Sequence, residues 1–219
     1  MMFSKRASMP TRIKICGITQ ADDAQAAVHA GADAIGLVFA PKSPRRVSLE
    51  QAINIAASLP PFVTTVALFV NAARAEVEEV IHALKPGCLQ FHGEESPAYC
   101  ASFAWPWLKA VRVKAGVDLL QCAALYAGAQ GMLLDAYSPH AHGGTGECFD
   151  WGLIPPQFPI PVVLAGGLQP ENVGAAIRQV RPWAVDVSSG VESAPGVKDV
   201  TKIAAFIKEV TNVDLQLSR

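Results

Sequence analysis

Short apolar runs recur along this chain, and segments with helical patterns lie between them. Runs such as Ala-Ile-Gly-Leu-Val-Phe and Pro-Val-Val-Leu-Ala show no polar–apolar alternation, which is typical of parallel strands buried on both faces. Eight such strand–helix units in 219 residues predict an α/β fold, a single-domain (β/α)8 barrel. An open doubly wound sheet stays possible, because a count of units does not show closure. The runs begin near Arg12, Ala34, Thr64, Cys88, Trp107, Gly131, Pro161 and Trp183.

Apolar residues between the runs follow the i, i+3, i+4, i+7 spacing of amphipathic helices. Two units have little room for a helix: residues 96–103 allow a short one, and residues 149–153 allow one turn before Pro155-Pro156. The clearest helical patterns are Val77, Val80, Ile81, Leu84 and Ile203, Phe206, Ile207, Val210.

The chain divides into one large unit and two short ends. We expect a barrel domain over residues 12–210, a short N-terminal extension over 1–11 and a C-terminal tail over 211–219. A content of 51% hydrophobic and 17% charged residues is typical of one well-filled globular domain. We see no linker and no second domain.

Charge and cysteine usage limit the partners. A net charge of −1 without a basic block argues against nucleic acid or an anionic membrane, so a small molecule is the expected partner. No signal peptide or membrane-spanning run is visible, which predicts a soluble, cytoplasmic protein. We expect it to be a monomer or a homodimer. Five scattered cysteines without a Cys-x-x-Cys pair predict reduced thiols rather than disulfides or a zinc site.

Polar residues gather where the predicted strands end: Cys16, Arg45, His92 and Asp135 follow the first, second, fourth and sixth strands. In a barrel these ends meet at one mouth, which is the catalytic face. Asp135 ends an apolar strand, where a carboxylate needs a partner, water or a catalytic task. A loop-capping role explains it equally well at this point.

Cys16 ends the first strand, and Gly17 permits a close turn after it. Most free cysteines are small buried hydrophobic residues, so the thiol alone is weak evidence of catalysis. A thiolate base at neutral pH needs nearby positive potential or helix-end amides that lower its pKa. Thr19 is a candidate N-cap for a helix that begins with Asp22 and Asp23.

Two glycine-containing loops follow the seventh and eighth strands: Ala-Gly166-Gly167-Leu and Ser-Ser189-Gly190-Val. In a (β/α)8 barrel these loops commonly bind phosphate through backbone N–H groups. Two tight turns without a ligand are the simpler explanation, but finding glycine in both loops favours a phosphate site.

Other polar segments are open to more than one interpretation. Pro41 and Pro44 stiffen the segment around Arg45, which favours a positioned anion contact over a solvated charge. His140 and His142 lack a third ligand nearby, so we expect no metal there. The glycine-rich residues 137–148 follow the sixth strand and are a candidate lid.

Taken together, these motifs resemble the phosphoribosylanthranilate isomerase family of tryptophan biosynthesis. The likeness covers residues 12–208, and several matching blocks in order are more specific than any one of them. The blocks are Lys14-Ile-Cys-Gly-Ile-Thr19, Ser43-Pro44-Arg45, Leu68-Phe-Val-Asn71, Leu89-Gln-Phe-His-Gly93, Leu134-Asp135, Gly143-Gly-Thr-Gly146, Phe149-Asp-Trp151, Ala165-Gly-Gly-Leu168 and Val185-Asp186-Val-Ser-Ser-Gly-Val-Glu192.

The resemblance implies an Amadori rearrangement of a phosphosugar, without cofactor or metal. By this likeness Cys16 is the general base and Asp135 the general acid. Arg45 faces the anthranilate carboxylate, and the phosphate lies on Gly166, Gly167, Ser189 and Gly190. His92 and Asp186 also match family blocks as substrate-binding residues, and support of the eighth loop is the alternative role for Asp186.

Two other functions compete with this one. The related aminoaldose–ketose isomerase of histidine biosynthesis has two phosphate sites, whereas here the third and fourth strands end without a Gly-Gly pair. A non-catalytic phosphosugar-binding barrel would need neither Cys16 nor Asp135.

Overall fold

The predicted strands form a closed parallel barrel. The computed structural model describes residues 9–114, 116–136 and 149–218. Each strand pairs with the next and β8 pairs with β1, which excludes the open doubly wound sheet. Every strand begins within one residue of its predicted start. The strands are β1 (Arg12–Cys16), β2 (Ala34–Val38), β3 (Thr64–Phe69), β4 (Cys88–Phe91), β5 (Trp107–Val113), β6 (Gly131–Ala136), β7 (Val162–Leu164) and β8 (Ala184–Val187).

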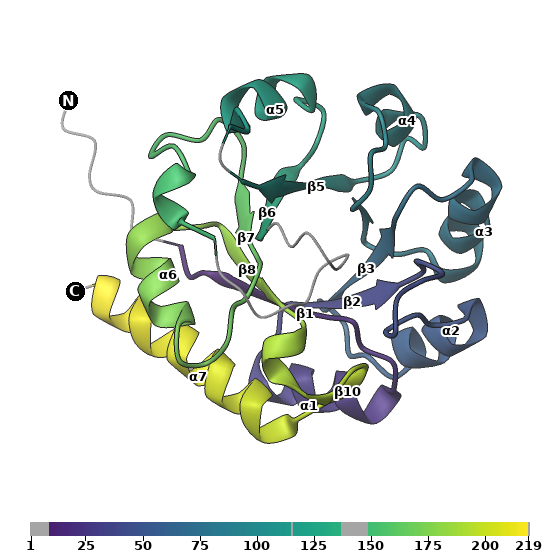
Figure 1. Cartoon of the computed structure of the whole chain (residues 1–219). Helices are drawn as coiled ribbons and strands as arrows, with labels where there is room; N and C mark the ends of the chain where they lie inside the picture. The colour runs from purple at the N-terminus through teal and green to yellow at the C-terminus, as the bar shows by residue number, and fades with distance from the viewer. Residues whose placement is uncertain (1–8, 115, 137–148, 219) are drawn as a thin grey trace, which may run out of the picture.

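Helices surround the barrel (Figure 1). Their apolar faces pack against the outward side chains of the strands, as where Phe206 and Ile207 join one buried cluster with Ile13 and Ile15. This packing explains why the outward faces of the strands are apolar. The helices are α1 (Ala21–Ala30), α2 (Leu49–Ala57), α3 (Arg74–Leu84), α4 (Pro97–Ala101), α5 (Leu119–Leu125), α6 (Val173–Val180) and α7 (Val200–Leu217).

The two units with little room for a helix are short, as predicted. Helix α4 has five residues, with Ser96 as N-cap and Pro97 in the first turn. Between β6 and β7, the described residues contain only the 3₁₀ turn η1 (Trp151–Leu153). The predicted lid at residues 137–148, which includes His140, His142 and Cys148, lies outside the described residues.

The last helix is longer than its predicted end at Val210. Helix α7 continues to Leu217, and Val213 is fully buried, so the same apolar stripe runs on for two more turns. Asp214 accepts hydrogen bonds from the backbone N–H of Thr11 at 2.6 Å and from its hydroxyl at 2.8 Å. The predicted boundary at residue 210 therefore falls inside a packed helix.

A small hairpin follows β8 at the mouth of the barrel. The 3₁₀ turn η2 (Ser189–Val191) leads into the antiparallel strands β9 (Glu192–Ala194) and β10 (Val197–Lys198). The hydroxyl of Thr19 donates to the carbonyl of Gly196 at 2.6 Å, and Gln20 is the N-cap of α1. The predicted capping role of Thr19 is thus wrong, because this hydroxyl ties the first loop to the hairpin instead.

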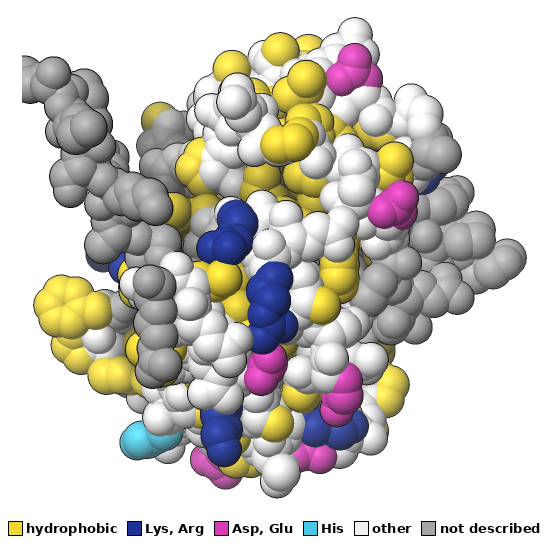
Figure 2. All heavy atoms as spheres, turned by 90° about the vertical axis from the view of Figure 1, so that its left-hand side faces the viewer, with side chains coloured by type: hydrophobic (Ala, Val, Ile, Leu, Met, Phe, Trp, Pro, Cys, Tyr) yellow, Lys and Arg dark blue, Asp and Glu magenta, His cyan; other side chains and the backbone are white. Residues whose placement is uncertain are grey.

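Charges of both signs are interspersed over the described residues on the face shown in Figure 2, as the near-neutral net charge leads one to expect. In the described part of the chain, no helix has both the length and the apolar character needed to cross a membrane.

Candidate active site

The carboxyl ends of the strands surround a cavity of about 750 Å³ at one mouth of the barrel. All predicted site residues except Gly190 line it: Cys16, Arg45, His92, Asp135, Gly166, Gly167, Asp186 and Ser189. The parallel register explains this convergence, since side chains at the ends of neighbouring strands share one edge. A cavity of this size suits a small organic ligand.

The Cys16 thiol is buried at the floor of the cavity, with 6% of the residue exposed. Burial raises the pKa of this thiol above its ordinary value, and the charge of Asp186 adds to the effect. Lys14 and Lys198 lower the pKa but do not outweigh burial. The positive potential expected from the sequence is therefore present, yet in the substrate-free protein the thiol form is favoured.

The raised pKa predicts how Cys16 reacts with iodoacetamide. Only the thiolate is alkylated, so labelling of the substrate-free protein should increase about tenfold per pH unit and keep increasing past pH 9. The rate is followed by mass spectrometry of the Cys16 peptide. The same peptide unfolded in urea is the reference, with a midpoint near ~8.5. A midpoint at or below that of the unfolded peptide would contradict the raised pKa.

Lys14 is a buried charge next to the cavity residues Cys16 and Asp186, and the sequence motifs did not identify it. Its Nζ lies 2.9 Å from Oδ1 of Asp186, and only 4% of the residue is exposed. Because side chains alternate along a strand, Lys14 and Cys16 point to the same face of β1. This spacing of two was visible in the sequence and could have identified Lys14.

Asp135 ends a chain of hydrogen bonds that begins at Gln90. Nε2 of Gln90 lies 3.0 Å from Nδ1 of His92, and Nε2 of His92 lies 3.0 Å from Oδ2 of Asp135. The backbone N–H of Ala136 donates to Oδ1 of Asp135 at 2.9 Å. Gln90 is fully buried, and its Oε1 has no partner among the described residues. The sequence analysis did not single out Gln90, although it stands two residues before His92 on the same strand face.

The Arg45 guanidinium is engaged by a carboxylate of the chain itself. Nε and Nη2 donate to the two carboxylate oxygens of Glu192, each at 2.7 Å, and Lys198 donates to Oε1 of Glu192 at 2.8 Å. These contacts lower the pKa of Glu192 although burial raises it. Arg45 lines the cavity, as predicted, but two nitrogen atoms of its guanidinium group already donate to Glu192.

The loops after β7 and β8 touch where Gly190 meets Leu168. Gly166 and Gly167 adopt left-handed backbone conformations with φ of +80° and +67°. A Cβ on Gly190 would overlap the carbonyl oxygen of Leu168, so Gly190 lies behind the cavity and lets the two loops meet. Ser189 and Gly190 open the turn η2, whose first N–H groups have no partner within the turn.

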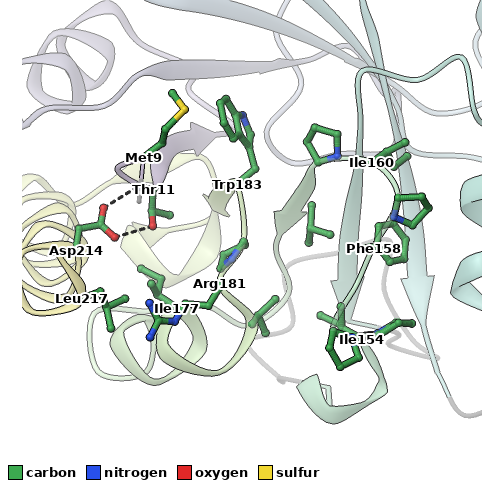
Figure 3. A pocket seen from close by; sticks show the side chains of 17 residues that line it. Met9, Thr11, Ile154, Phe158, Ile160, Ile177, Arg181, Trp183, Asp214 and Leu217 are labelled. Carbon is green, nitrogen blue, oxygen red and sulfur yellow. Dashed lines mark hydrogen bonds between the residues drawn. The ribbon is translucent and has the colours of Figure 1, made fainter. Parts of the chain in front are cut away.

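A second cavity, of about 580 Å³, lies at the opposite end of the barrel (Figure 3). It is lined by prolines and apolar side chains near the start of β7 and β8, together with Thr11 and Asp214, which bind each other. None of the predicted site residues reaches it. The described residues also contain no group of three or more His, Cys, Asp or Glu side chains placed to hold a metal ion.

Comparison with known proteins gives one consistent result. The family model of N-(5'phosphoribosyl)anthranilate (PRA) isomerase matches residues 13–209. N-(5'-phosphoribosyl)anthranilate isomerase of Thiobacillus denitrificans is 58% identical over 92% of this chain and 98% of that protein. The enzyme of Pseudomonas fluorescens is 59% identical over 92% and 96%.

Solved structures agree with these relatives. Phosphoribosyl anthranilate isomerase from Thermotoga maritima superposes with a TM-score of 0.86 at 44% identity, over 92% of this chain and 99% of that one. A phosphoribosyl anthranilate isomerase in complex with reduced 1-(o-carboxyphenylamino)-1-deoxyribulose 5-phosphate has a TM-score of 0.82 at 43% identity, with the same coverage. The chain therefore belongs to the N-(5'-phosphoribosyl)anthranilate isomerase family.

Proposed function

We propose that this chain converts N-(5'-phosphoribosyl)anthranilate into 1-(2-carboxyphenylamino)-1-deoxyribulose 5-phosphate, an Amadori rearrangement in tryptophan biosynthesis, by general acid–base catalysis. The observation that carries the mechanism is the cavity itself: the Cys16 thiol, the Asp135 carboxyl group and the two glycine-containing loops line the same mouth of the barrel. Membership of the family supports the choice of reaction, and the side chains in the cavity support the individual chemical steps.

Asp135 acts first, as the acid. Its carboxyl group gives a proton to the furanose ring oxygen, the bond from that oxygen to C1 breaks, and the anthranilate nitrogen forms a C=N bond to C1. The Cys16 thiolate then removes the proton from C2. The electron pair of that C–H bond forms a C1–C2 double bond and neutralises the iminium nitrogen. The resulting enolamine tautomerises to the ketone, which completes the transfer.

The proton on Asp135 depends on the sense of its hydrogen-bond chain. When the Gln90 amide donates to Nδ1 of His92, Nε2 of His92 carries the ring hydrogen and donates to an Asp135 carboxylate. If the Gln90 amide is rotated by 180°, its Oε1 accepts from the Nδ1–H of His92. Nε2 of His92 then has no hydrogen and accepts one from a protonated Asp135. We assign this second sense to the acid form, with His92 as the residue that orients it.

The two ends of the substrate are anions and need different partners. The phosphate is assigned to the backbone N–H groups of the loops that contain Gly166, Gly167, Ser189 and Gly190. The anthranilate carboxylate is assigned to Arg45, which lines the cavity. Arg45 follows β2, whereas the phosphate loops follow β7 and β8, and β1 lies between β2 and β8. Asp186, bound to Lys14 beside Cys16, is assigned to the substrate hydroxyls near C2.

The competing isomerase of histidine biosynthesis fits this cavity less well, because the loops after β3 and β4 hold a carboxylate of the chain. Oε1 of Glu95 accepts from the backbone N–H of Asn71 at 2.8 Å, and Oε2 accepts from that of Gly93 at 2.9 Å. These are the amides that a second phosphate would use, and Glu95 already occupies them. The non-catalytic alternative leaves the acid–base pair unexplained.

Loss of the fluorescence of phosphoribosylanthranilate tests the proposed activity directly. The purified chain should accelerate this loss in proportion to its concentration. A signal that is unchanged by the protein, at concentrations where a solved relative is active, would refute the activity.

Substitution of Arg45 tests the carboxylate assignment. Arg45→Ala should raise KM by about tenfold or more, since a charge-assisted hydrogen bond contributes roughly 1.5–3 kcal/mol. Arg45→Lys should raise KM less, because lysine keeps the charge and loses the fork. Steady-state kinetics provide the measurement. Arg46→Ala is the matched control, since Arg46 is exposed and outside the cavity. Equal KM values for Arg45→Ala and its control would return Arg45 to a structural role with Glu192.

Assembly and location belong to the proposal as well. One relative from Thermotoga maritima is described as a dimeric phosphoribosylanthranilate isomerase from which monomers were generated. Both states are therefore compatible with the family, and a monomer or homodimer in the cytoplasm stays our prediction. Light scattering coupled to size-exclusion chromatography measures the state.

A further inference from the structure

Gly36 stands in the middle of β2, opposite Cys16 in the parallel ladder. No turn occurs there, and its backbone is not left-handed, so local conformation does not require glycine. A Cβ at this position would come within 2.8 Å of the Cys16 sulfur and 3.0 Å of Lys14 Nζ. Such contacts are closer than carbon, sulfur and nitrogen atoms pack in proteins. The space of the missing side chain is therefore filled from two sides, by the thiol and by the ammonium group.

The Lys14 ammonium is held firmly in this place. Its Nζ donates to Oδ1 of Asp186 at 2.9 Å and also interacts with the Cys16 thiol, and only 4% of the residue is exposed. Burial opposes its charge, yet the charges of Asp186 and Cys16 outweigh burial and raise the pKa of Lys14, so it stays protonated. A permanent positive charge thus borders the sulfur atom that must become negative.

We propose that Lys14 is a positioning residue for Cys16, holding its thiolate against the ammonium group, and that Gly36 is required because its missing side chain lets the two groups meet. The proposal rests on Cys16 being the base in the proposed function.

Three other charged groups act on Cys16 from neighbouring elements. Asp186 on β8 opposes the thiolate, whereas Lys198 on β10 and Arg45 after β2 attract it. Both of these cations bind Glu192, which compensates half of their combined charge. Lys14 has the largest lowering effect on the pKa of Cys16. Its removal should therefore move the thiol further toward the protonated form.

The test measures the pH midpoint of iodoacetamide labelling at Cys16 in the substrate-free protein. Steric access changes the labelling rate at every pH alike, so the midpoint reports the charge environment. Lys14→Met should move the midpoint up and slow labelling near neutral pH by about tenfold or more. Gly36→Ala should act in the same direction, because its methyl group separates sulfur from ammonium.

Two further variants keep the test decisive. Lys14→Met combined with Asp186→Asn leaves no unpaired buried charge, so it remains measurable if the single variant does not fold, and its midpoint should also lie above wild type. Lys109→Met is the matched control: Lys109 is a buried lysine in β5 that binds Glu95 at 3.0 Å. It should lower the melting temperature and leave the Cys16 midpoint unchanged.

Each result decides part of the proposal. Wild-type midpoints in both Lys14 variants would overturn the role of Lys14, and a wild-type midpoint in Gly36→Ala would overturn that of Gly36. Because labelling needs no substrate, it is independent of turnover. If the midpoints shift but Cys16→Ala retains wild-type activity, the assignment of the base fails, and with it the catalytic role of Lys14, while the reaction itself still stands.

Discussion

Cys16→Ser and Asp135→Asn should each lower kcat by about 10²-fold or more while the substrate still binds. A serine hydroxyl is too weakly acidic to serve as the base, and asparagine has no carboxyl proton to give to the ring oxygen. Both variants keep the size of the original side chain, so the cavity and the phosphate loops should be unchanged. Steady-state kinetics separate kcat from KM, and product binding followed by fluorescence verifies that the cavity still binds.

Cys16→Asp provides a positive test of the same role. A carboxylate at this position is itself a base, so the variant should recover part of the rate that Cys16→Ser loses. Cys122→Ser is the control, because Cys122 lies on α5 outside the cavity and should retain full activity. Turnover of folded Cys16→Ala within a few-fold of wild type would remove Cys16 from the mechanism.

Gly190→Glu should abolish useful substrate binding. Even a methyl group at this position overlaps the carbonyl of Leu168, so any side chain forces the two phosphate loops apart, and glutamate adds a negative charge beside the phosphate. Each lost hydrogen bond to the phosphate is worth roughly 1.5–3 kcal/mol, so KM should rise about 10²-fold or more. Gly190→Ala should show a smaller rise, because it separates the loops without adding charge.

Gly128→Ala is the matched control for the added methyl group. Its Cβ would meet Trp107 at 3.5 Å, an ordinary contact far from the cavity. Circular dichroism checks that the barrel persists in all three variants. A near wild-type KM in folded Gly190→Glu would place the phosphate elsewhere.

The barrel was predictable because its signals are local. Each strand is a short apolar run, and each run needs only its own residues to be recognised, so the predicted starts agree with the structure. The end of α7 could have been predicted as well, since Val213 and Leu217 continue the apolar stripe of Val210. Thr19 shows the limit of local signals, because its hydroxyl binds Gly196, which is far away in sequence.

The site was only partly predictable for the same reason. Strand ends and the family resemblance identified the side chains around the cavity, but not their partners. Lys14 binds Asp186 across 172 positions, and Arg45 binds Glu192 across 147 positions. The direction of the Cys16 pKa depends on the balance between burial and these charges, which a sequence does not display. Gly36 was missed because the proposed requirement for glycine comes from contacts that a side chain would make with Cys16 and Lys14, and these contacts are visible only in the structure.

The cavity at the far end of the barrel allows stability to be changed independently of activity, although the two often oppose each other in enzymes. Its apolar lining near Phe158, Ile160 and Trp183 is built from residues that none of the proposed catalytic steps uses (Figure 3). Larger apolar side chains there would fill empty space, and substitutions at distant, independent sites combine additively. Directed evolution can therefore raise heat tolerance from one end of this barrel while it alters substrate preference from the other.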